Sequence, residues 1–308
     1  MPVSATTARR RTPPPSAWLV VPLNVAVLVG AVPVIVGRDR DADCPSTTST
    51  EDDLGVAHVH GLGIDPADDS LYIATHHGMF RIEDGAPPQT VGETVQDTMG
   101  FTVTGPGRFL GSGHPDVAGL EAGDPGLLGL IESTDAGESW DDISLSGEAD
   151  FHALVAVHDL VYGWDSTSSQ LMVAPDGRDW EVWSRIALTG FAVDPADEER
   201  TVAATPEGVR LSSDGGRRWD APSSPVLVVV SWAADGPLWG LEPSGRVQRS
   251  DDGGSSWEPA GALDEAPQAL LATGDDLWAA ASDEDDLTGI YRSDDGGETW
   301  NLEHRDEA

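Results

Sequence analysis

Short apolar runs alternate with short polar breaks along most of the chain, and this pattern predicts strands. Between residues 186 and 223, the runs are IALTGFAVD, TVAAT, GVRLS and WDAPS. Their β-branched and apolar residues favour strands, whereas the glycine, proline and aspartate between them favour turns. The runs lack the spacing near 3.6 residues that an amphipathic helix requires. We therefore predict a unit of four antiparallel strands in this segment.

The same unit recurs at an almost constant distance. The template Ser-x-Asp-x-Gly-x-x-Trp appears in four segments, and APDGRDW, which ends at Trp180, is a shortened copy; the full copies end at Trp140, Trp219, Trp257 and Trp300. Four-stranded repeats with a period of about 40 residues are typical of β-propellers. Units begin near residues 58, 98, 150, 187, 227 and 266. We predict an all-β propeller over residues 56–304 with six blades, or seven if the preceding linker adds a strand.

The repeated turn resembles the Asp box of the BNR-repeat propellers, a group that includes sialidases, sortilin-like receptors and photosystem-assembly propellers. The resemblance covers roughly residues 56–304. In such a turn the aspartate can accept backbone N–H groups, glycine supplies a positive φ, and tryptophan fills space beneath the hairpin. The box is specific for the fold and carries little information about chemistry. We expect it to be scaffold, with the functional site elsewhere.

The N-terminal segment predicts a membrane anchor. Residues 18–37 contain no charge and are long enough to cross a bilayer as a helix, and Arg9, Arg10 and Arg11 precede them. We predict a basic cytoplasmic tail (1–16), a single transmembrane helix (17–37), a flexible acidic linker (38–55) and a propeller on the extracytoplasmic side of the cell membrane. A signal peptide, cleaved or uncleaved, is the alternative.

The net charge of the chain argues against polyanionic partners. The net charge is −37, and all 17 basic residues are arginine. Binding to nucleic acid or to anionic lipid requires clustered positive charge, so we expect neither. The single cysteine, Cys44, cannot form an internal disulfide.

The repeats also provide an internal control, because a position that every blade needs should recur in every blade. Residues 58–82 align with residues 187–212, and Gly61 and Gly78 match Gly190 and Gly208. Four histidines of the first segment have no counterpart, because alanine, threonine, proline and glutamate replace them in the second: His58, His60, His76 and His77. Their presence therefore needs a reason other than the fold.

Three further residues extend this pattern. Met99 and His152 occupy the column of His60 in the second and third units, and His114 lies in the loop that corresponds to His76 and His77. In an antiparallel blade these positions lie on one face, opposite the Asp boxes. Imidazole and thioether ligands suit copper best and zinc next, but not calcium or magnesium. We predict a metal-binding rim of His58, His60, His76, His77, Met99, His114 and His152. An organic or glycan ligand, or polar packing alone, is the alternative.

The resemblance to sialidases suggests a glycosidase, but several residues argue against it. Residues 80–82 (FRI) are similar to the Phe-Arg-Ile-Pro motif, yet Glu83 replaces the proline and Arg81 falls in a column shared by the repeats. Tyr162 is the one plausible tyrosine nucleophile, and arginines are sparse on the histidine face. No catalytic residue is identified. Another glycoside hydrolase could use rim carboxylates as acid and base, namely Asp97, Asp116 or Asp150.

A binding platform is the third class of function. Propellers often bind proteins or glycans through one rim, and fold alone does not choose among functions. Trp164 could add an aromatic contact for a sugar.

Overall fold

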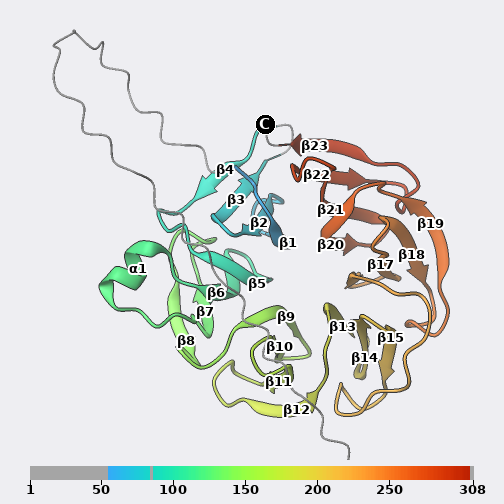
Figure 1. The fold of residues 1–308 in the computed structure, drawn as a ribbon, viewed down its shortest axis with the longest axis horizontal. Coiled ribbons are helices and arrows are strands. Elements are labelled where there is room, and N and C mark those ends of the chain that lie inside the picture. Colours follow the sequence, from blue (N-terminus) through green and yellow to red (C-terminus); the bar gives the residue numbers. More distant parts are fainter. Residues whose placement is uncertain (1–54, 84–85, 306–308) are drawn as a thin grey trace, which may run out of the picture. The chain divides into compact units, whose positions relative to one another are not determined.

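A computed structural model describes residues 55–83 and 86–305, and within these ranges six antiparallel sheets form a ring (Figure 1). The innermost strands contact one another in the order β1, β5, β9, β13, β16 and β20, and β20 contacts β1 again. The predicted six-bladed propeller is confirmed. The described residues form no seventh blade.

Each sheet follows the chain from its innermost to its outermost strand. Blade one contains β1 (Val59–Ile64), β2 (Leu71–Thr75), β3 (Gly78–Ile82) and β4 (Gln89–Val91). Blade two contains β5 (Asp97–Gly105), β6 (Arg108–His114), β7 (Leu130–Ser133) and β8 (Asp141–Ser144). Blade three contains β9 (Phe151–Val157), β10 (Leu160–Asp165), β11 (Gln170–Ala174) and β12 (Glu181–Arg185).

The second half of the ring repeats this arrangement. Blade four contains β13 (Gly190–Asp194), β14 (Asp197–Thr205) and β15 (Gly208–Ser212). Blade five contains β16 (Val229–Trp232), β17 (Leu238–Leu241), β18 (Arg246–Ser250) and β19 (Glu258–Ala262). Blade six contains β20 (Ala266–Thr273), β21 (Asp276–Ser282), β22 (Thr288–Ser293) and β23 (Asn301–Arg305).

Blade four differs from its prediction in three ways. The segment 219–223 forms one isolated bridge, between Ser223 and Val209, and not the expected fourth strand. Pro222 and Pro225 flank this bridge and have no N–H group, so the segment cannot continue a ladder. The first strand also begins later than expected, at Gly190, and β14 begins at Asp197, within the predicted turn.

Each Asp box follows the third strand of its blade, and its hydrogen bonds stabilise the turn there, as expected for a scaffold role. In the blade-five copy, Asp252 Oδ1 accepts hydrogen bonds from Ser256 N at 2.8 Å and from Ser250 Oγ at 3.0 Å. Ser250 Oγ in turn accepts Gly254 N at 2.8 Å, and Gly254 has a φ of +87°. Trp257 then packs against the adjoining core. The corresponding serine binds its glycine N–H in three other copies, at Ser133, Ser212 and Ser293.

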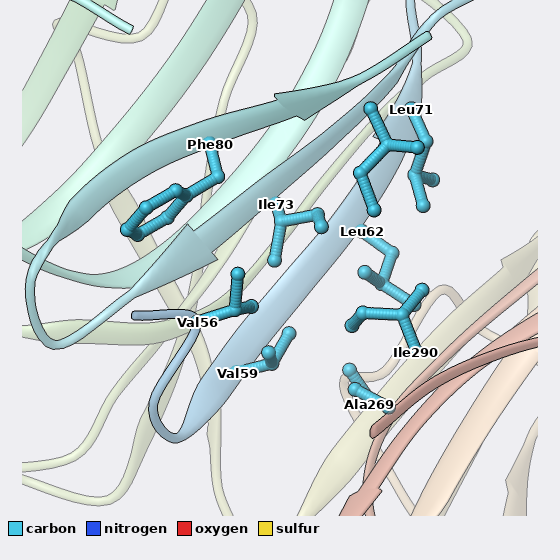
Figure 2. Packing of buried hydrophobic residues seen from close by; sticks show 10 residues of the cluster. Val56, Val59, Leu62, Leu71, Ile73, Phe80, Ala269 and Ile290 are labelled. Atoms are coloured by element: carbon cyan, nitrogen blue, oxygen red, sulfur yellow. The ribbon is translucent and has the colours of Figure 1, made fainter. Parts of the chain in front are cut away.

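The ring closes without strand exchange among the described residues, because blades one and six are each built from consecutive strands. Figure 2 shows the apolar cluster at this junction, where Val59 and Leu62 of blade one lie near Ala269 and Ile290 of blade six. Val59 N also donates to the Gln268 side chain at 2.8 Å. Burial of apolar surface, with a few polar contacts, therefore holds the two ends of the propeller together.

The predicted membrane helix at 17–37 lies outside the described residues, as do the tail 1–16 and nearly all of the linker 38–55. Within the described ranges, no helix is long and apolar enough to cross a membrane. The helix α1 (Val117–Ala122) is a short insertion between β6 and β7, capped by Asp116, which accepts Gly119 N at 2.7 Å.

Candidate metal centre

A β-bulge lies near the start of the innermost strand in each of the first three blades. The register shifts at His60 in β1, at Met99 in β5 and at His152 in β9. A bulge inserts one extra residue into a ladder and redirects its side chain. His60 and His152 line the mouth of the central channel, a cavity of about 290 Å³. The three residues that the alignment placed in one column, His60, Met99 and His152, therefore occupy equivalent positions in the structure.

Three histidines of blade one meet at this mouth. One ring nitrogen from each of His58, His60 and His76 lies within 4.8 Å of the other two. The His58 and His76 rings stack with centroids 4.8 Å apart, and the centroids of His60 and His76 are 4.4 Å apart. His58 has a φ of +51°, an uncommon conformation for a residue with a side chain, and such conformations cluster at functional sites.

A carboxylate from the next blade completes this group. Asp97, the first residue of β5, places Oδ1 2.8 Å from His76 Nδ1 and 3.6 Å from His60 Nε2. This oxygen is buried and accepts no well-aligned hydrogen bond among the described residues. His60 Nε2 and His76 Nδ1 also lie 3.3 Å apart, within hydrogen-bonding distance of each other. An anionic oxygen beside several imidazoles is a donor set that transition-metal sites use.

The polar group extends into blade three. Asp97 Oδ2 lies 3.3 Å from His114 Nδ1, and His114 Nε2 lies 3.8 Å from Asp150 Oδ2. Asp150 Oδ2 also contacts His152 Nε2 at 2.8 Å and accepts Ser166 Oγ at 2.8 Å. The five histidines and two aspartates form one continuous group across the first three blades.

Close packing of blades two and three makes this continuity possible. A Cβ atom at Gly100 would lie 2.3 Å from the carbonyl oxygen of Phe151, so only glycine allows β5 and β9 to approach this closely. Phe151 N donates to Ser112 Oγ across the same junction at 2.9 Å. Asp150 and His152 flank Phe151 and are therefore held beside blade two.

Burial keeps the central histidine neutral. The His60 side chain is 10% exposed, and burial, together with the charges of His76 and His58, lowers its pKa to about 3 although Asp97 opposes the shift. Burial and His76 also lower the pKa of His58. Burial by itself would raise the pKa of Asp150, but hydrogen bonds from His152 and Ser166 leave it lowered. Neutral imidazoles and ionised carboxylates are the forms that bind metal ions.

The two remaining predicted ligands are Met99 and His77. Met99 occupies the bulge of β5 and is half-buried. His77 has a structural role through its backbone, because its N–H group donates to Thr75 Oγ1 at 2.9 Å. Its side chain lines a hollow of about 580 Å³ beside α1, which His76 and Asp97 also border.

The residues considered for glycosidase chemistry have other partners. Arg81 pairs with Asp68 and Glu83. Tyr162 is fully buried in the core of blade three, where burial raises the pKa of its hydroxyl group. Trp164 packs in the same core, with Nε1 donating to Ile186 O at 2.8 Å.

The sequence analysis named Asp97 and Asp150 as acid–base candidates and missed them as partners of the histidines. A signal was present. Asp97 precedes Met99 by two residues, and Asp150 precedes His152 by two residues. His58 stands at the same place before His60. A second column of potential ligands therefore runs beside the first, and it could have been found by the same alignment.

Comparisons with known proteins support the fold. The BNR/Asp-box repeat family matches residues 291–302, which confirms the resemblance drawn from the repeated turn. A search of curated protein sequences finds no match. Similar solved structures include those of YCF48 bound to D1 peptide, of a nidogen/laminin complex and of an ancestral GH74 enzyme.

The similarity is at the level of the fold. YCF48 has 16% identity over 80% of this chain and 81% of its own, with a TM-score of 0.51. The structure from the nidogen/laminin complex has 13% identity over 76% and 92%, with a TM-score of 0.58. The GH74 enzyme has 14% identity over 81% and 38%, with a TM-score of 0.48.

Proposed function

We propose that the protein binds a transition-metal ion through His58, His60, His76 and Asp97, at the rim of blades one to three. The observation that carries this proposal is the convergence of three imidazoles within 4.8 Å, with a buried carboxylate oxygen 2.8 Å from one of them. The turn that carries His76 does not require its side chain, because blade four forms the same turn with Pro206 in its place.

The donor set favours copper(II), with zinc second. Three nitrogen donors and one oxygen donor suit either ion, and copper(II) binds most such sites more tightly. Calcium and magnesium prefer oxygen ligands almost exclusively. A set of nitrogen and oxygen donors suits copper(II) better than copper(I), which prefers soft thiolate and thioether ligands.

The proposed setting is the outer side of a membrane. Residues 17–37 would anchor the chain, and the arginines before them would keep the N-terminus in the cytoplasm. The propeller and its histidine rim would then face the extracytoplasmic space, where the site can exchange metal with that compartment.

A glycoside hydrolase receives less support from the same residues. A paired acid and base need two available carboxyl groups. Asp97 and Asp150 are each held by histidines, and Asp116 caps α1.

A protein-binding platform is the second candidate. The hollow beside α1 is bordered by exposed apolar side chains, of which Val117 is 72%, Leu120 52% and Val95 46% exposed. Exposed apolar surface of this kind often marks a site for a partner. YCF48 and the nidogen/laminin complex, as their structures record, have peptide or protein partners.

Metal titration of the full chain tests the first proposal. We expect copper(II) and zinc to bind the wild type stoichiometrically, and binding to weaken strongly in His60→Thr, which introduces the residue found at this position in blade four. His77→Ala is the matched control, because it removes a neighbouring histidine outside the group. Equal binding by wild type and His60→Thr would contradict the proposal and make the platform the preferred function.

A further inference from the structure

We propose that the centre is binuclear, with Asp97 between two metal ions and the second ion held by His114, Asp150 and His152. This inference rests on the proposed function, because it adds a second ion beside the first. It assigns a role to His114, Asp150 and His152, which lie outside the His58, His60 and His76 group.

The two oxygens of Asp97 face different histidines. Oδ1 lies beside His76 and His60, at 2.8 and 3.6 Å, whereas Oδ2 lies 3.3 Å from His114 Nδ1. A carboxylate with one oxygen directed to each of two donor groups has the geometry of a bridging ligand. Bridged pairs of metal ions in proteins are about 3.5–4 Å apart.

The second group repeats the design of the first, one blade further along the ring. In the first group, a histidine that follows the second strand of blade one, His76, meets the aspartate at the start of blade two, Asp97. In the second, His114 at the end of the second strand of blade two meets Asp150 at the start of blade three, with 3.8 Å between Nε2 and Oδ2. A bulge histidine joins each group but from a different side, because His60 belongs to the blade of His76 whereas His152 belongs to the blade of Asp150.

Asp150 shows independently that this position suits a cation. Its side chain is 6% exposed, and its Oδ1 is buried without a hydrogen-bond partner among the described residues. A buried carboxylate oxygen without a donor is costly unless a cation or a water molecule lies beside it.

Long-range charge supports the binding of two dications. The carboxylates of Asp97 and Asp150 balance only part of the charge of two divalent cations. The chain as a whole, however, carries a net charge of −37. Such a field attracts cations to the rim and lowers the cost of holding two of them close together.

The test is the number of metal ions bound by the full chain. Wild type, His60→Ala, His152→Ala and Asp150→Asn would be equilibrated with zinc, dialysed and analysed for metal content, with circular dichroism as the check of folding. Titration of the same variants with cobalt(II), followed by the absorption of the bound ion, would count the sites in a second way. We expect two equivalents in wild type, one in His60→Ala and one in His152→Ala. Asp150→Asn conserves shape, so it replaces His152→Ala if that variant does not fold.

The other outcomes separate this inference from the proposed function. One equivalent in wild type, lost in His60→Ala and retained in His152→Ala, would overturn the second site and leave the first. One equivalent lost in both variants would show a single shared ion and overturn the binuclear arrangement. No bound metal in wild type would overturn both proposals.

Discussion

The turn between β2 and β3 in blade one and the turn between β14 and β15 in blade four have the same construction. Thr75 Oγ1 donates to Gly78 O at 3.0 Å and accepts His77 N at 2.9 Å. In blade four, Thr205 Oγ1 donates to Gly208 O at 2.7 Å and accepts Glu207 N at 3.3 Å. The backbone is shared, but blade one presents two histidines where blade four presents Pro206 and Glu207.

This comparison separates what the fold needs from what the site needs. Threonine and glycine recur because the turn depends on a side-chain hydrogen bond and a positive φ, which is +90° at Gly78 and +131° at Gly208. The histidines do not recur, because no bond of the turn uses their rings. These histidines are gathered at one point although the turn does not require them, and the proposed metal site would give them a role.

Rewriting the blade-one turn should produce the largest effect. We expect His76→Pro/His77→Glu, which copies blade four, to weaken metal binding by more than about 100-fold, because loss of an outer-shell contact alone typically costs 10–100-fold. Stability should change little, since the backbone of the turn already accepts these residues. Isothermal titration calorimetry with zinc would measure the affinity.

The reverse substitution provides the control. Pro206→His/Glu207→His places two histidines on the blade-four turn without the partners that Asp97 and His60 supply, and it should create no metal site. Equal zinc affinity in wild type and in the blade-one variant would show that the turn contributes no ligand.

The next effect should appear in the stability of the metal-free protein at acidic pH, which depends on the buried position of His60. The pKa of His60 is about 3 in the native state and near 6.5 in the unfolded chain, so the unfolded state binds the extra proton between these values. The free energy of unfolding of the metal-free protein should therefore fall as pH decreases from 6.5 to 3, by at most about 1.4 kcal/mol per pH unit for this residue. His60→Thr should reduce that slope, measured by urea unfolding at several pH values. An unchanged slope would mean that His60 is protonated in the native state.

Weakening an Asp box should produce the smallest and least specific effect. Asp252→Ala removes acceptors for Ser256 N and Ser250 Oγ, and because both Asp252 and Ser256 are exposed each lost hydrogen bond should cost only about 0.5–1.5 kcal/mol. The melting temperature should fall while zinc affinity stays at the wild-type value, because the box lies on the face opposite the histidines. A parallel loss of affinity would show that the two faces are coupled.

Much of the fold could be predicted because the repeats are local. Each hairpin depends on residues close in sequence, such as Ser250, Asp252 and Gly254, so their spacing is sufficient to identify it. The fourth strand predicted in blade four, which does not form, is the exception. The composition of residues 219–223 is compatible with a strand, but Pro222 and Pro225 limit the pairing of this segment to one bridge.

The sequence by itself determined the four-stranded repeat, the face of each loop and the column that contains His60 and His152, because these follow from period and alternation along the chain. The structure decided between six blades and seven, since the described residues form six sheets. Only the tertiary structure decided which side chains meet. Asp97 joins His60 and His76 because ring closure sets adjacent blades side by side, and Gly100 brings the next junction close enough to include Asp150. These are contacts between residues distant in the chain, and no local pattern specifies their distances.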